Sequence, residues 1–158
     1  MKKKIVFYLG WILLPLAVGG IAALLTAGNM ALYTTIRQPP LAPPSILFPI
    51  VWTVLYFLMG ISSGMVASAD AGCHRLTKNG LLAYGISLVL NFSWSLVFFN
   101  GRMFWLAFLI LIALWVTILI TILQMRRVNK TAAVLQIPYL LWVTFAGYLN
   151  LAIALLNA

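Results

Sequence analysis

Five long runs of apolar residues, separated by polar links, set the pattern of this chain. They cover residues 5–27, 47–69, 81–99, 103–125 and 132–156. As a helix, the first run rises roughly 35 Å at ~1.5 Å per residue, enough to cross a bilayer with some tilt. The pattern predicts an all-α integral membrane protein, in which a five-transmembrane-helix bundle forms a single membrane domain over residues 1–158.

The first link, residues 28–46, differs from the others in length and in composition. It contains four of the seven prolines of the chain, Pro39, Pro40, Pro43 and Pro44. Proline fixes its own backbone angle and biases the preceding residue away from the helical region. We therefore predict that this link is extended and stiff rather than helical.

Composition excludes a soluble globule and a disordered chain. Hydrophobic residues make up 65% of the 158 residues and charged residues only 7%, against about 25% charged in a soluble domain. The formal net charge is +9. Because the basic residues lie at the ends of the apolar runs, they indicate a membrane and not a nucleic-acid partner.

The basic residues also predict an orientation, because cytoplasmic loops of membrane proteins are enriched in Lys and Arg. With the N-terminus in the cytoplasm, the outer side holds only Arg37 and Arg102. The inner side then holds Lys2, Lys3, Lys4, Arg75, Lys78, Arg126, Arg127 and Lys130. Five spans place the C-terminus and the proline-rich link outside, and we call residues 28–46 the outer link.

Few residues are suited to acid–base or metal chemistry. The chain has one acidic residue, one Cys and one His, and they lie together at Asp70, Cys73 and His74, where we expect a solvated inner turn. Paired-carboxylate catalysis is excluded within one chain, and no metal site and no required cofactor are expected. Function must therefore depend on aromatic rings, amides, hydroxyls and the backbone.

Three of the predicted spans carry stripes of aromatic residues with an amide or hydroxyl at helical spacing. The stripes are Trp52, Tyr56 and Met59; Asn91, Trp94, Ser95 and Phe98; and Tyr139, Trp142, Ala146 and Asn150. Such stripes suit a flat, largely apolar aromatic ligand, but they also suit ordinary packing of a bundle, with Asn91 as an interhelical hydrogen bond. Periodicity alone does not separate the two.

Small residues at Gly60 and Gly64 form a Gly-x-x-x-Gly pattern in the second span. This spacing lets two helices approach closely. It fits packing within the bundle and dimerisation equally well.

Three motifs in this order resemble the translocator protein family, also called tryptophan-rich sensory proteins or peripheral benzodiazepine receptors. The first runs from Tyr33-Thr-Thr-Ile-Arg37 through the prolines to Phe48-Pro-Ile-Val-Trp52 and Met59-Gly60. The second is Asn91-Phe-Ser-Trp94 with Phe98-Phe99, and the third is Pro138-Tyr139-Leu-Leu-Trp142 through Asn150. Together they extend over almost the whole chain.

The resemblance implies a homodimer of five-helix bundles with a ligand pocket beneath the first link. It implies binding of porphyrins such as protoporphyrin IX and haem, and of isoquinoline carboxamides and benzodiazepines. The pocket residues carried over by motif are Tyr33, Trp52, Asn91, Trp94, Trp142 and Ala146. The lid residues are Arg37, Pro39, Pro43 and Pro44.

We therefore expect a membrane-embedded tetrapyrrole-binding protein that acts as a sensor, carrier or scavenger. One alternative is light- and oxygen-dependent degradation of porphyrin, for which the resemblance implies the pocket residues Trp52 and Trp142. A further alternative is passive movement of porphyrin or another small molecule along the bundle. No other catalytic residue is expected.

The chain departs from the family pattern at two places. Leu41 stands where the family commonly has a Trp between the prolines, so the lid lacks one aromatic contact. No basic residue follows Tyr148, so the C-terminal sequence does not support sterol binding by the motif that some members carry. A bacterial cell membrane is therefore the expected location.

Overall fold

A computed structural model of the protein describes residues 2–69 and 74–157, which form helices and turns without a strand. Within these residues, five helical stretches are long and apolar enough to span a bilayer, which confirms the predicted fold class. The helices are α1 (Lys2–Thr26), α2 (Leu32–Thr35), α3 (Leu47–Ala67), α4 (His74–Ser95), α5 (Phe104–Val128), α6 (Lys130–Leu135) and α7 (Ile137–Leu156). A short 3₁₀ turn, η1 (Ala27–Asn29), and a π-helical turn, η3 (Leu96–Asn100), follow α1 and α4.

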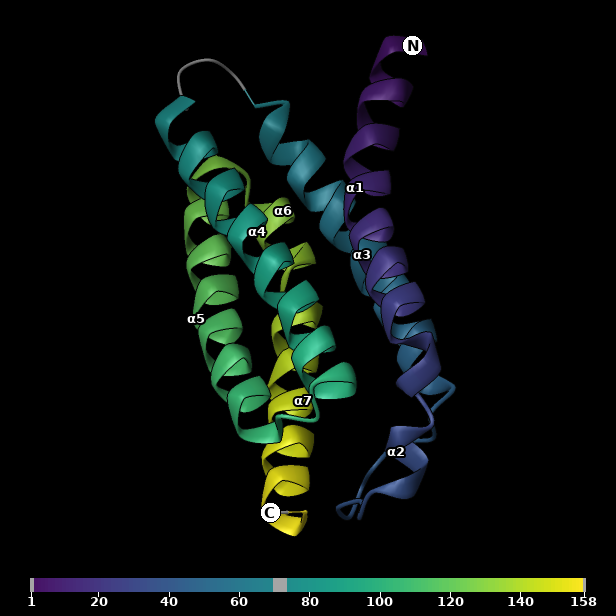
Figure 1. Cartoon of the computed structure of the whole chain (residues 1–158). Helices are drawn as coiled ribbons and strands as arrows, with labels where there is room; N and C mark the ends of the chain where they lie inside the picture. The colour runs from purple at the N-terminus through teal and green to yellow at the C-terminus, as the bar shows by residue number, and fades with distance from the viewer. Residues whose placement is uncertain (1, 70–73, 158) are drawn as a thin grey trace.

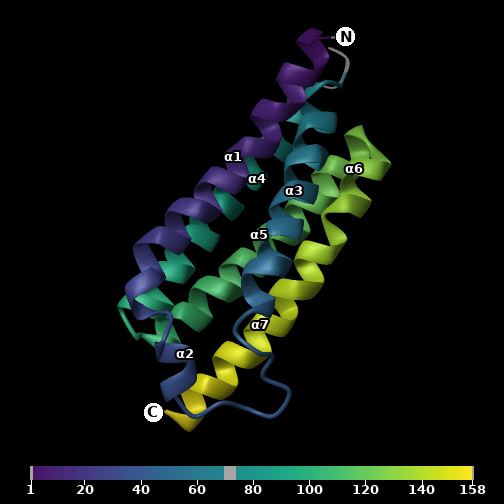
Figure 2. The same ribbon diagram turned by 90° about the vertical axis from the view of Figure 1, so that its right-hand side faces the viewer.

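The long helices form a closed bundle, in which α3 also contacts α4 across the centre. Helix α1 packs on α3, α3 on α6, α7 on α5, α5 on α4, and α4 returns to α1. The N- and C-termini lie at opposite ends of the bundle (Figure 1). Helix α2 and the rest of the outer link lie at the end that holds the C-terminus, as both views show (Figure 2). This is the arrangement that an odd number of spans requires, whereas the orientation in the membrane stays a prediction.

The third span is longer than its apolar run. Helix α4 begins at His74 rather than at residue 81, so His74 lies in a helix and not in a turn, although it is exposed as the prediction of a solvated position required. His74, Arg75 and Lys78 are exposed on the first turns, where long basic side chains reach the interface while their stems cover apolar surface. Asp70 and Cys73 lie outside the described residues.

The outer link and the fifth span also differ from their predictions. The first half of the link is helical in η1 and α2, because prolines begin only at Pro39; from Arg37 to Ile46 the link is non-helical, as predicted. The fifth span is divided at Gln136 into α6 and α7. Pro138 lacks the N–H that the carbonyl of Val134 would accept, which accounts for the break.

Small residues hold α1 against α3. A Cβ added to Gly60 would collide with the backbone of Ile12, and one added to Gly64 would lie 2.8 Å from the ring of Tyr8. The Gly60–Gly64 face is therefore covered by α1 of the same chain, which favours packing within the bundle over dimerisation for this pattern.

The core has a polar part at the end nearer the N-terminus. The hydroxyl of Ser62 on α3 donates to the carbonyl of Ala132 at 2.8 Å, and the Gln136 amide donates to that hydroxyl at 3.2 Å. These bonds fix α3 to the break between α6 and α7. The other end of the bundle, beneath the outer link, contains a cluster of aromatic rings, among them Phe48, Trp52 and Trp94.

Candidate functional site

The predicted pocket residues lie on α2 within the outer link and on three helices that meet beneath the link. Tyr33 comes from α2, Trp52 from α3, Asn91 and Trp94 from α4, and Trp142 and Ala146 from α7. Two small hollows separate them. Trp52 and Trp94 line the first, of about 110 Å³, and Tyr33, Trp94 and Ala146 line the second, of about 20 Å³.

A third hollow, of about 440 Å³, lies between the outer link and the start of α3. Its wall contains Tyr33, Phe48 and Phe99. Phe48 and Phe99 also line both smaller hollows, so these two rings separate all three spaces. The three adjoining spaces together have a volume within the range of about 300–1,000 Å³ that is usual for small-molecule sites.

Sequence reasoning did not assign Phe48 and Phe99 to the pocket, although both belong to the quoted motifs. A signal was present for Phe48, which lies one helical turn before Trp52 and so on the same face of α3. For Phe99 there was none. It lies in the π-helical turn η3, whose wider register differs from the α-helical spacing used to define the stripe through Asn91, Trp94 and Phe98.

Trp52 is the centre of the aromatic cluster. Its ring stacks on Tyr56 with centroids 5.4 Å apart. It lies 6.2 Å from the ring of Trp94 and 6.1 Å, edge to face, from that of Tyr139. Offset and edge-to-face contacts at these distances are the favourable geometries for aromatic pairs. One face of the predicted pocket is therefore rigid and already packed.

Asn91 lies deeper than the hollows and lines none of the three. Its amide donates a 3.0 Å hydrogen bond to the hydroxyl of Tyr56, which does line the 110 Å³ hollow. The side-chain oxygen of Asn91 is buried and accepts no hydrogen bond from any described residue. Asn91 thus positions Tyr56 and keeps one free acceptor beneath the Trp52–Tyr56 stack.

Trp94 is held by a chain of hydrogen bonds. Its indole N–H donates to the Asn150 side-chain oxygen at 3.0 Å, and the Asn150 amide donates to the carbonyl of Phe104 at 2.8 Å. These bonds join α4, α7 and the start of α5. Because the polar atom of Trp94 is already used, only its ring is available to the hollows.

Trp142 faces the hollows only through Phe48. The two rings meet edge to face with centroids 6.0 Å apart. The indole N–H of Trp142 is buried and finds no acceptor within the part of the chain that the structure describes. A buried donor without a partner costs about 1–3 kcal/mol, so it is the kind of group that a ligand would satisfy.

The outer link covers this site through Tyr33. The Tyr33 ring packs edge to face on Phe48 at 5.0 Å, its hydroxyl donates to the carbonyl of Pro43 at 3.1 Å, and the Gln38 amide donates to its carbonyl. Burial raises the pKa of Tyr33, so its hydroxyl stays protonated as a donor. Pro39 is buried and Pro43 half-buried, whereas the predicted lid residues Arg37 and Pro44 are exposed.

Leu41, at the position of the missing Trp, points away from the bundle. It is 81% exposed and has a φ of 68°, in the left-handed region that costs a non-glycine residue about 1–2 kcal/mol. We expected the lid to lack one aromatic contact at this position, and the exposed Leu41 side chain agrees with that expectation. Cover over the hollows comes from Tyr33 instead.

Chemically, the site offers ring surfaces that line the hollows and, behind them, three buried polar atoms without a partner among the described residues: the Trp142 N–H, the Asn91 side-chain oxygen and the Tyr139 hydroxyl. No charged side chain lines any of the three hollows. Such a site suits recognition of a flat apolar molecule by stacking, with orientation set by few polar contacts.

Comparison with known proteins places the chain in a family. The family model described as TspO/MBR matches residues 11–156. The tryptophan-rich protein TspO of Chlorobaculum tepidum is 38% identical over 158 residues, 99% of each chain. The CrtK protein of Rhodobacter capsulatus is 32% identical, covering 88% of this chain and 85% of that one, and the translocator protein of Bos taurus is 32% identical, covering 89% and 84%. Five spans, the aromatic site under the outer link and these matches agree: the chain belongs to the TspO/MBR family, a family of membrane sensory and translocator proteins.

Proposed function

We propose that this protein binds tetrapyrroles such as protoporphyrin IX and haem within the membrane, and that it acts as a sensor, carrier or scavenger of them. The observation that carries the proposal is the set of three hollows beneath the outer link, which share Phe48 and Phe99 in their walls. A tetrapyrrole is flat, aromatic and largely apolar, and it is too large for either small hollow alone.

Binding would then begin with movement of the outer link and rotation of Phe48 and Phe99. The macrocycle would stack against the cluster centred on Trp52. The unpaired N–H of Trp142 would donate to an acceptor on the ligand, and the unpaired oxygen of Asn91 would accept from a donor. Arg37, exposed on the link, would attract a propionate at the outer surface.

The same groups suit smaller flat ligands that carry a carbonyl, such as isoquinoline carboxamides and benzodiazepines. The N–H of Trp142 would donate to that carbonyl. Such ligands need less movement of the link than a tetrapyrrole does, because the 440 Å³ hollow already adjoins Tyr33 and Phe48.

The test is a titration of protoporphyrin IX, in the dark, into the purified full-length chain in nanodiscs. Saturable quenching of tryptophan fluorescence is expected. Trp52→Leu should weaken binding about two- to tenfold, since it removes stacking worth about 0.5–1.5 kcal/mol beyond the buried area. Trp105→Leu is the matched control, because Trp105 is half exposed at the start of α5, away from the hollows. Non-saturable quenching that is equal in all three proteins would mean that the porphyrin only partitions into lipid.

Light-dependent degradation of the bound porphyrin is a second candidate. The observation that favours it is the close contact of Trp52 with three other oxidisable rings, Tyr56, Trp94 and Tyr139. New absorption bands are expected when the complex is illuminated in air, and they should be lost in Trp52→Phe but kept in Trp105→Phe. Bleaching at the rate of free porphyrin in detergent would contradict degradation and leave binding unaffected.

We also propose that the protein is a homodimer in a bacterial cell membrane, with its N-terminus in the cytoplasm. The support for the orientation is the number of basic residues at the end of the bundle where α1 begins, compared with Arg37 and Arg102 at the other end. Labelling of single cysteines at Ser45 and Lys130 with an impermeant thiol reagent, in a Cys73→Ser background, tests it in intact cells. Only the cysteine at position 45 should react.

A further inference from the structure

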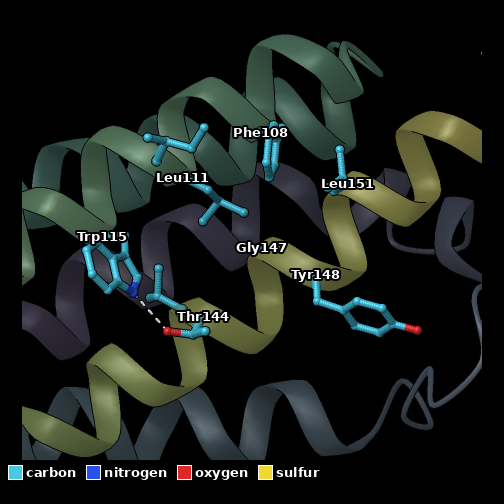
Figure 3. Close-up of a pocket in the computed structure, with 9 residues that line it drawn as sticks. Phe108, Leu111, Trp115, Thr144, Gly147, Tyr148 and Leu151 are labelled. Carbon is cyan, nitrogen blue, oxygen red and sulfur yellow. Dashed lines mark hydrogen bonds between the residues drawn. The ribbon is translucent and has the colours of Figure 1, made fainter.

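A second hollow lies on the outside of the bundle, between α5 and α7. It has a volume of about 330 Å³ and is separate from the site under the outer link, with which it shares no lining residue. Phe108, Leu111 and Trp115 form one wall, and Thr144, Gly147 and Tyr148 form the other (Figure 3). We call it the α5–α7 groove.

The polar atoms of the groove already have partners. The N–H of Trp115 donates to the Thr144 hydroxyl at 2.8 Å, and that hydroxyl donates to the carbonyl of Leu140 at 2.8 Å (Figure 3). The Tyr148 hydroxyl points away along the groove, to the carbonyl of Pro40. An occupant therefore has no unpaired polar group to satisfy, and it gains most if it is aliphatic.

Exposed apolar side chains surround the groove, which places it on the lipid-facing surface. Leu109, Ile112 and Leu141 are among them. Along α7 the groove extends from Val143 to Leu151, roughly 12 Å at ~1.5 Å per residue. Its floor is open at Gly147, where an added Cβ would meet no atom within 4 Å. An extended segment of a fatty acyl chain fits a groove of this length and lining.

The basic residues at the outer-link end of the groove indicate which charge a lipid headgroup there would carry. The groove ends at Phe108, about one turn inside the start of α5 at Phe104, and Arg102 lies exposed two residues before that start. Arg37 is at the same end of the bundle, because its backbone is bonded to Asn157 beyond α7. No Asp or Glu occurs among residues 2–69 and 74–157, so no carboxylate of the described chain opposes a negative headgroup there.

From these observations we infer that the α5–α7 groove binds one acyl chain of an anionic membrane lipid, whose headgroup lies beside Arg102. The site does not depend on the proposed tetrapyrrole function. It is connected to the outer link, however, because Tyr148 both lines the groove and bonds Pro40.

The inference is tested with lipids that carry bromine on the acyl chain, because bromine quenches tryptophan on contact. The full-length chain in detergent micelles is titrated with brominated phosphatidylglycerol or brominated phosphatidylcholine. The fluorescence of Trp115 alone is obtained by subtracting the fluorescence of the Trp115→Phe variant from that of the natural chain. Quenching of this signal should saturate at an about fivefold lower mole fraction of the anionic lipid, since one arginine near an anionic surface contributes about 1 kcal/mol.

Two variants test the binding of the acyl chain and the preference for the headgroup independently of each other. Gly147→Leu fills the groove from its open floor and should abolish saturable quenching of Trp115. Gly85→Leu is the matched control, since Gly85 is also half-buried in a span with open space around an added Cβ, and it should bind as the natural chain does. Arg102→Asn removes the charge while keeping a residue that tolerates the φ of 51° at this position, and it should remove the preference for phosphatidylglycerol.

Quenching that rises in proportion to mole fraction, equally for both headgroups and in Gly147→Leu, would mean that Trp115 meets only bulk lipid and would overturn the inference. Saturable quenching without a headgroup preference would overturn its anionic part. Thermal unfolding of each variant in the same micelles shows whether Gly147→Leu is folded. If it is not, Gly147→Val, which fills less of the groove, takes its place with the same expected loss.

Discussion

The hydroxyl of Tyr148 on α7 donates a 2.8 Å hydrogen bond to the carbonyl of Pro40, in the outer link 108 residues earlier. Asn157 also bonds the link. Its side-chain oxygen accepts from the backbone N–H of Arg37 at 2.9 Å, and its side-chain amide donates to the Arg37 carbonyl at 3.0 Å. These exposed bonds hold the link against the end of α7. The hollows beneath the link are divided, so a large ligand enters only if the link moves. The strength of these hydrogen bonds should therefore govern the association rate of a large ligand.

Removing the Tyr148 hydroxyl should accelerate ligand binding. Tyr148→Phe keeps the ring in the α5–α7 groove and deletes one hydrogen bond, worth about 0.5–1.5 kcal/mol. We expect the association rate of protoporphyrin IX, followed by stopped-flow quenching, to rise about two- to tenfold while the unfolding temperature changes little. Tyr8→Phe is the control, since the Tyr8 hydroxyl makes a similar exposed bond with Ser68, just after the end of α3 and at the other end of the bundle. An equal rate in Tyr148→Phe and the natural chain would show that the link is not what limits binding.

Replacing Trp142 by Phe should weaken binding without destabilising the fold. The lost N–H is buried without a partner among the described residues, so its removal relieves a cost of about 1–3 kcal/mol, which offsets the smaller packed volume. Affinity for a carbonyl-containing ligand should fall about tenfold, as one hydrogen bond is lost in the complex. Calorimetric titration measures the affinity and thermal unfolding the stability. A variant that is much less stable yet binds equally well would assign Trp142 to packing alone.

The sequence predicts the end of a helix well where hydropathy changes there, and poorly where the helix depends on contacts with its neighbours. The start of α3 at Leu47 and of α5 at Phe104 lie within one residue of the predicted limits, because hydropathy changes sharply there. The start of α4 does not, because its first turns are polar and their helical state depends on the neighbouring helices. Helix α2 was missed because four residues held by tertiary contacts carry no periodic signal.

The candidate site shows the same division between local and long-range information. Stripes on single helices identified Trp52 and Trp94, which the structure brings to one hollow. They did not predict that Asn150 would bind the indole of Trp94, or that Tyr56 would lie between Asn91 and the hollows, because both depend on how helices far apart in sequence are rotated against each other. Hydropathy carries no information on that rotation where a span is apolar on all sides.

The pair of Asn91 and Tyr56 gives a direct test of that packing. Asn91→Leu leaves the Tyr56 hydroxyl without its donor, and Tyr56→Phe leaves the Asn91 amide without its acceptor, so each should destabilise the protein by about 1–3 kcal/mol. The double variant removes both groups and should cost less than the sum of the two, with a coupling of about 0.5–1.5 kcal/mol. Unfolding of all four proteins in detergent gives the cycle. Strict additivity would mean that the bond contributes nothing to stability.

Gly60 provides the test that separates packing within the chain from packing between chains. Gly60→Ala places a methyl group against the backbone of Ile12 and 2.8 Å from the carbonyl of Trp11, where no flexible side chain can move away. Helix α1 must then shift from α3, at a cost of about 1–3 kcal/mol in the monomer. Gly20→Ala is the control, because a Cβ at Gly20 meets no atom within 4 Å. Thermal unfolding and size-exclusion chromatography in detergent measure the two effects separately. If Gly60→Ala left the monomer equally stable but broke a dimer, Gly60 would face a second chain, and the assignment of its partner to Ile12 of the same chain would be wrong.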